Sequence, residues 1–254
     1  MDISNDGKYA ASSAFNKTFL LWDVYNSIIL ERMKGHEDVT MTVCFSPDNR
    51  LIASGSNDLN IKIWDVESRQ VIKTLHGPTQ DVYDVAFSPD SRLLAVASKD
   101  KSVRIYEVEE EKLIHMLKGH REMVLEVAFS PDGHYLVSGS DDHSLMLWDV
   151  ASGERIHHYL DNEEAILDLV FHPDGQSFYS ISFANDLTRW ALHPEIFVLK
   201  YFEEPYRKEV NADPLFETRR KGEAKKDYSV RQSAAAIKKT EILKHYYQQY
   251  LDGR

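Results

Sequence analysis

Cysteine is almost absent from the sequence, since Cys44 is the single one among 254 residues. One thiol cannot form a disulfide framework or a zinc ribbon, so both classes of small stabilised domain are excluded. Cys44 lies in a Val-Cys-Phe triplet that is matched by Val-Ala-Phe at 85–87 and 127–129. We therefore expect Cys44 to be a small core residue. A single thiol also fits a reducing compartment, and we expect a cytoplasmic protein.

Long apolar runs and common catalytic motifs are missing as well. No stretch of 18 apolar residues occurs, so the sequence predicts no membrane-spanning helix. The phosphate loop Gly-x-x-x-x-Gly-Lys-Ser/Thr and the nucleophile elbow Gly-x-Ser-x-Gly are both absent. The chain is nevertheless long enough, with 43% hydrophobic residues, to bury a sizeable core.

What the sequence does contain is a repeat. The stretch SPDGHYLVSGSDDHSLMLWDV at 130–150 has similar copies that begin at residues 4, 46, 88 and 172, always 42 apart. A second marker follows the same period: Trp22, Trp64, Tyr106, Trp148 and Trp190. Similarity that keeps phase in this way indicates a repeat architecture.

Each repeat has the pattern of four short strands. In the repeat around residue 130 these are residues 123–129, 134–140, 144–150 and 154–160, rich in β-branched and aromatic residues. Pro-Asp-Gly at 131–133, Ser-Asp-Asp at 140–142 and Ser-Gly at 152–153 supply the turns between them. The pattern predicts four antiparallel strands per repeat and no helix within residues 30–190.

Period, strand count and signature residues together resemble the WD40 β-propeller family over residues 1 to about 202. The resemblance implies an all-β fold of about five four-stranded blades, with the outer strand of the fifth at 197–202. When the first repeat is aligned with the others at Ser4, its inner strand would have to begin before Met1. We therefore expect the five blades to be part of a larger ring, with further repeats upstream.

The resemblance also implies a buried hydrogen-bonded tetrad in the second and fourth repeats. Its members would be His36, Ser54, Asp58 and Trp64, and His120, Ser138, Asp142 and Trp148. The third repeat has Pro78, Val96 and Tyr106 at the matching positions and keeps only Asp100. The fifth has Asn162 and Ala184, and the first has Asn16. We expect these three blades to depend on apolar packing, and Asp100→Ala to cost less stability than Asp142→Ala.

The end of the chain differs in composition. Residues 200–254 carry 13 basic and 9 acidic side chains, whereas the preceding residues carry 17 basic and 32 acidic ones. Residues 203–228 have the pattern of a polar linker, and residues 229–251 that of an amphipathic helix. Its apolar stripe is Ala236, Thr240, Leu243, Tyr247 and Tyr250. This stripe or another subunit would cover an open edge of the propeller.

WD40 propellers commonly bind peptides on the face formed by the loops before the first strand and between the second and third strands. The candidate residues on this face are Met41, Tyr83, Arg121, Met123 and Leu125. The alternative is that these side chains only pack between blades. Asp141, Asp142 and His143 are residue types that can bind a metal ion, but Asp142 already has a structural role as the aspartate of the tetrad. We expect no metal, no cofactor and no catalytic residues.

The sequence thus predicts a non-enzymatic scaffold that binds a protein or peptide partner. An alternative is a regulatory or sensor domain of a larger enzyme whose catalytic part is encoded elsewhere. A third reading, a nucleic-acid-associated factor that uses the basic end of the chain, is disfavoured because the acidic propeller would oppose such binding.

Overall fold

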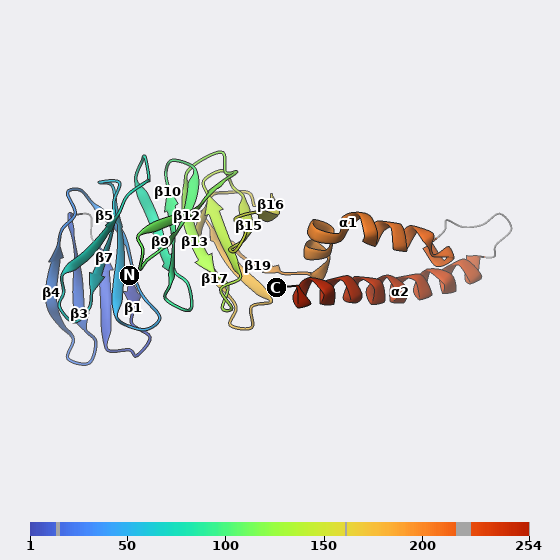
Figure 1. Ribbon diagram of the computed structural model, residues 1–254, viewed down its shortest axis with the longest axis horizontal. Helices are drawn as coiled ribbons and strands as arrows, with labels where there is room; N and C mark the ends of the chain where they lie inside the picture. Colours follow the sequence, from blue (N-terminus) through green and yellow to red (C-terminus); the bar gives the residue numbers. More distant parts are fainter. Residues whose placement is uncertain (14–15, 161, 217–224, 254) are drawn as a thin grey trace. The chain divides into compact units, whose positions relative to one another are not determined.

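A computed structural model describes residues 1–254 except 14–15, 161, 217–224 and 254. The chain divides into two compact units, Met1–Ala191 and Leu192–Arg254, which are treated separately below. The first unit contains five antiparallel sheets, one for each sequence repeat (Figure 1). The predicted propeller architecture is therefore confirmed.

Four of the sheets have four strands in sequential order. Blade one comprises β1 (Asp2–Ile3), β2 (Tyr9–Ser13), β3 (Thr18–Asp23) and β4 (Ile28–Lys34). Blade two comprises β5 (Thr40–Phe45), β6 (Leu51–Ser56), β7 (Ile61–Asp65) and β8 (Val71–Leu75). Blade three comprises β9 (Val82–Phe87), β10 (Leu93–Ser98), β11 (Ser102–Glu107) and β12 (Lys112–Lys118). Blade four comprises β13 (Val124–Phe129), β14 (Tyr135–Ser140), β15 (Leu145–Asp149) and β16 (Arg155–Tyr159).

The Ser-Pro-Asp turn recurs because it satisfies its own polar groups. In blade two the Ser46 hydroxyl donates to Asp48 at 2.5 Å and accepts the backbone N–H of Leu51 at 2.9 Å. The residue after the aspartate has a positive φ, 62° at Asn49 and 74° at Gly133. Asparagine and glycine tolerate this left-handed conformation better than most residues. Each inner strand is thereby joined to the next strand by a closed turn.

Small residues allow neighbouring blades to approach closely. A Cβ atom on Gly55 would lie 2.4 Å from Cγ1 of Val82, and one on Gly139 would lie 2.6 Å from Cγ2 of Ile166. The side chains of Ile61, Leu75, Val82 and Val85 form part of a continuous core between blades two and three. The inner strands β5, β9 and β13 consequently lie side by side.

Blade five differs from the prediction. It has three strands, β17 (Ile166–Phe171), β18 (Ser177–Ser182) and β19 (Leu187–Ala191). The outer strand expected at 197–202 is instead part of helix α1 (Pro194–Ala212). Proline in the first turn and the adjacent Glu195 both favour a helix start. Helix formation buries Phe197 and Val198, which the sequence pattern had assigned to a strand.

The second unit is helical over most of the predicted linker. Residues 203–212 belong to α1, a short 3₁₀ helix covers Pro214–Phe216, and α2 spans Lys225–Asp252. The linker prediction for 203–228 is therefore wrong at its start, and residues 217–224 lie outside the described part of the chain. No helix among the described residues is long and apolar enough to cross a membrane.

The predicted stripe of α2 is confirmed at Leu243, Tyr247 and Tyr250 and wrong at Ala236 and Thr240. Val198 and Tyr206 of α1 pack with Ile242 of α2 in the core of this unit. Ala235, Ile242 and Tyr250 are buried, whereas Ala236 and Thr240 are exposed. Burial of Ile242 removes more apolar area from water than burial of an alanine or a threonine would.

Candidate partner-binding face

The tetrad of blade two is assembled in the structure. The ring nitrogens of His36 lie 2.8 Å from the Asp58 carboxylate and 2.8 Å from the Ser54 hydroxyl. The indole N–H of Trp64 donates to the same hydroxyl at 2.8 Å. Asp58 also accepts the backbone N–H of Glu37, at 2.8 Å. The aspartate therefore ties the loop before β5 to the body of the blade.

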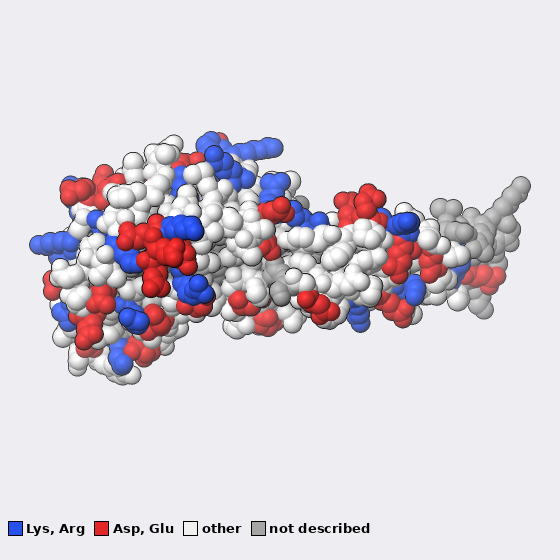
Figure 2. Space-filling view, in the orientation of Figure 1, with Lys and Arg blue, Asp and Glu red and all other residues white. Residues whose placement is uncertain are grey.

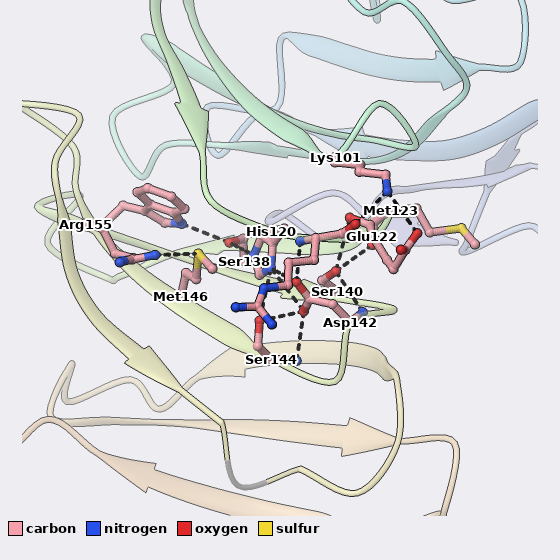
Figure 3. A network of polar contacts seen from close by, with 12 residues as sticks. Lys101, His120, Glu122, Met123, Ser138, Ser140, Asp142, Ser144, Met146 and Arg155 are labelled. Carbon is pink, nitrogen blue, oxygen red and sulfur yellow. Dashed lines mark hydrogen bonds and ion pairs between the residues drawn. The ribbon is translucent and has the colours of Figure 1, made fainter.

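Blade four repeats this arrangement (Figure 3). His120 lies 3.2 Å from Asp142 and 2.7 Å from the Ser138 hydroxyl, which also accepts the Trp148 indole N–H at 2.8 Å. The backbone N–H of Arg121 donates to Asp142 at 2.6 Å. Burial would raise the pKa of Asp142, but hydrogen bonds from the histidine, Ser144 and the Arg121 amide hold it well below its usual value.

Blade three has a replacement for the tetrad that the sequence did not predict. The guanidinium of Arg104, a residue only 3% exposed, lies 2.8 Å from the Asp100 carboxylate. The Tyr106 hydroxyl, in place of the indole, donates to the carbonyl of His76 at 2.9 Å. Asp100 still accepts the backbone N–H of the loop residue Thr79 at 2.9 Å. Apolar packing, which the sequence predicts for this blade, is present, but a buried ion pair that was not predicted also holds its loop.

The first and fifth blades keep only part of the network. Trp22 donates to Ser12 at 2.8 Å, and Trp190 donates to Ser180 at 2.8 Å. Blade five has Ala184 at the position of the aspartate, and the buried amide nitrogen of Asn162 has no partner. Among its described residues, the loop before β17 has no carboxylate contact like those that hold the loops before β5, β9 and β13.

Four inner strands, β5, β9, β13 and β17, have a bulge at the same place, just after the loop that precedes each strand. The register shifts between Thr40 and Thr42 in β5, and the equivalent extra residues are Tyr83, Leu125 and Leu167. We call Met41, Tyr83, Leu125 and Leu167 the bulge row. Three of its members are half-buried, and Leu167 is 37% exposed. A bulge leaves its extra residue outside the ladder, so each of these four large, partly exposed residues lies unpaired at the start of its inner strand, next to the preceding loop.

The sequence prediction and the bulge row overlap in Met41, Tyr83 and Leu125. Arg121 and Met123 lie instead in the loop before β13. The carbonyl of Arg121 accepts a hydrogen bond from the Lys101 ammonium at 2.6 Å, and the Met123 carbonyl accepts one from Ser140 at 2.8 Å (Figure 3). Their backbones hold the loop, while the Arg121 side chain is exposed and the Met123 side chain half-buried.

Sequence reasoning missed a row of carboxyl groups one residue further along the same strands. We call Asp84, Glu126 and Asp168 the carboxyl row; Thr42 occupies the equivalent position in β5. Asp84 accepts hydrogen bonds from the Thr42 hydroxyl at 3.0 Å and from the Val127 backbone N–H at 3.1 Å. It therefore links the inner strands of blades two, three and four. The 42-residue spacing of these acidic residues was the signal that could have found them.

One member of the carboxyl row keeps its proton. Burial, together with the negative charge of Asp84, raises the pKa of Glu126 to about 10. Burial also raises the pKa of Asp84. The protonated Glu126 and the neighbouring Asp84 hydrogen-bond to each other. Two adjacent carboxyl groups are thus held at the inner strands with a proton between them.

Metal binding and thiol chemistry are two other possibilities for the described residues. Within the described residues, no group of three or more His, Cys, Asp or Glu side chains is arranged to hold a metal ion. Cys44 is half-buried, and burial raises the pKa of its thiol well above the usual value. A thiol in that state is a poor nucleophile.

The comparison with protein families agrees with the geometry. Residues 1–172 match the family described as the second beta-propeller of the echinoderm microtubule-associated protein. The chain belongs to this family. The match ends just after β17, so the three-stranded character of blade five and the helical unit lie mostly outside it. No curated protein matches the chain.

Proposed function

We propose that the chain is a non-enzymatic scaffold whose propeller binds a peptide or protein partner on the face that carries Met41, Tyr83, Arg121, Met123 and Leu125. The observation that carries the proposal is the bulge row. Four bulges in register place large, partly exposed apolar side chains beside loops that are pinned in three blades. Apolar and aromatic anchors on a rigid frame are the usual centre of a protein interface.

Membership of a propeller family named for association with microtubules, which are protein polymers, supports a protein as partner. The excess of acidic over basic residues before Lys200 argues against nucleic acid. The cytoplasmic location expected from the sequence stays a prediction.

The test begins with peptides selected on the intact protein from a phage-displayed random library. Replacing Tyr83 and Arg121 together with alanine should abolish binding of the selected peptides without lowering the melting temperature, because both side chains are at least partly exposed. The matched control is a double alanine variant of Ile72 and Ile114, which are exposed on the outer strands β8 and β12. Binding that survives the first double change and is lost in the control would show that the face is misassigned.

A further inference from the structure

The bulge row and the carboxyl row form two successive layers on the inner strands. In β9, β13 and β17 the bulge residue is followed directly by the carboxyl residue, as in Tyr83-Asp84 and Leu125-Glu126. A group that approaches from the loop face therefore meets apolar side chains first and carboxyl groups next.

This order matches the side chains of lysine and arginine, which have an aliphatic stem and a cationic head. The two other common occupants of a carboxyl site fit less well. A metal ion would need converging ligands, and no such group exists among the described residues. An acidic peptide would meet repulsion from Asp168, which is exposed on β17.

The surrounding charge favours the same partner. The part of the chain before Lys200 carries 32 acidic and 17 basic residues. On the side of this unit that Figure 2 draws, acidic and basic side chains are interspersed. Two of the basic side chains near the loop face are paired, since Lys99 lies 3.0 Å from Asp81 and Lys101 lies 3.2 Å from Glu122, whereas the Arg121 side chain is exposed on the same face. The excess negative charge would thus attract a basic segment to this unit, and contacts with the bulge row and the carboxyl row would fix its position.

We propose that the partner of this face is a basic peptide, one lysine or arginine of which lays its stem on the bulge row and its cationic head against the carboxyl row. The inference rests on the proposed function and adds the chemistry of the partner to it.

The protonated state of Glu126 gives the proposal a second consequence. The charged groups that face Glu126 are Asp84 on β9, Asp168 on β17 and the amino group of Met1. A bound cation would favour the ionised form of Glu126, so that binding releases a proton. Affinity should then rise with pH, up to the pH at which Glu126 loses its proton in the free protein.

The experiment uses arrayed peptides with randomised flanks and a central arginine, lysine, citrulline or glutamate. Citrulline has the shape of arginine without its charge. Arginine- and lysine-centred peptides should bind at least about tenfold more tightly than citrulline-centred ones, a factor that corresponds to about 1.4 kcal/mol. Equal binding of arginine and citrulline peptides would overturn the proposal.

Two charge-matched variants separate a local contact from long-range attraction. Asp168→Asn should remove most of the preference for arginine over citrulline. Glu110→Gln changes the net charge equally in the exposed turn between β11 and β12, at the other end of the blade, and should leave the preference intact. Equal losses in the two variants would mean that only the overall charge acts, and the proposal would be wrong.

Failure of this inference can be told from failure of the proposed function. If citrulline peptides bind as well as arginine peptides and Tyr83→Ala abolishes both, the face is correct and the cation contact is not. If no peptide depends on Tyr83, the face itself is wrong. Calorimetry in two buffers of different ionisation enthalpy should show proton release for the wild type and none for Glu126→Gln; proton release in both would contradict the role of Glu126.

Discussion

In blade four a histidine holds Asp142, whereas in blade three an arginine holds the equivalent Asp100. Both aspartates accept a backbone N–H from the loop before the inner strand, from Arg121 in one blade and from Thr79 in the other. The common requirement is therefore a buried carboxylate that pins the loop. The side chain that neutralises and orients this carboxylate can differ between blades.

The two solutions differ in what remains when one partner is removed. Loss of Asp142 leaves a ring nitrogen of His120, the Ser144 hydroxyl and the Arg121 amide without their common acceptor. Loss of Asp100 leaves the buried guanidinium of Arg104, a charged group in proteins, without its carboxylate. A buried unpaired charge costs more than a buried unpaired dipole. The comparison thus ranks the blades in the order opposite to the one expected from the sequence.

The largest effect is expected for Asp100→Ala. It should lower the free energy of unfolding by about 3–5 kcal/mol, because it orphans the buried Arg104 guanidinium. Blade four has Met146 at the position of Arg104, so the double variant Asp100→Ala with Arg104→Met should recover much of the loss. Denaturant titration measures both values. A single variant that is less destabilised than the double one would refute the importance of the pair.

A smaller loss is expected for Asp142→Ala, about 1–3 kcal/mol, since the partners left behind are His120, Ser144 and the Arg121 amide. The same titration compares it with Asp100→Ala under one set of conditions. Asp142→Ala should be the milder change by at least about 1 kcal/mol. If it is the more harmful one, the distinction between histidine and arginine as the holding group fails.

How far the sequence predicts this molecule depends on whether a feature obeys the repeat. The blades, the Ser-Pro-Asp turns and the tetrad partners of His36 and His120 all follow the 42-residue period, so one alignment places them. The carboxyl row obeys the period too, but Thr42 interrupts it, and its pairing across blades depends on how the inner strands pack. Such a contact lies between repeats, where the periodicity of one repeat carries no information.

The features that were predicted wrongly are those that break the repeat. Arg104 lies at a position filled by Lys62 and Met146 in its neighbours, so nothing in the alignment indicated that it would pair with Asp100. Likewise, Phe197 and Val198 lie where the 42-residue repeat predicts an outer strand, but they belong to a helix that begins at Pro194. Helix-start signals and tertiary packing favour the helix there over the strand that the repeat predicts. The bulges themselves could not be predicted, because a bulge is a property of paired strands.

The smallest expected effect extends the comparison to blade two and to pH. Burial lowers the pKa of His36 below its usual 6.5, despite the nearby Asp58, so the folded blade favours the neutral ring. The unfolded chain takes up a proton near pH 6.5, so this contribution to stability is present above that pH and is lost as the pH falls through it. Blade three has Pro78 at this position and contains no equivalent titration.

Hydrogen exchange between about pH 7.5 and pH 5.5, corrected for the intrinsic rate, should therefore show protection falling in β6 and β7 more than in β10 and β11. The aspartates contribute nothing to this difference, because Asp58 and Asp100 both have pKa values below their usual range and stay ionised over the whole interval. His36→Gln should remove the pH dependence of blade two while lowering its protection at every pH. A parallel fall in blades two and three would show that the pH response is global, and the histidine and arginine blades would then be equivalent in this respect.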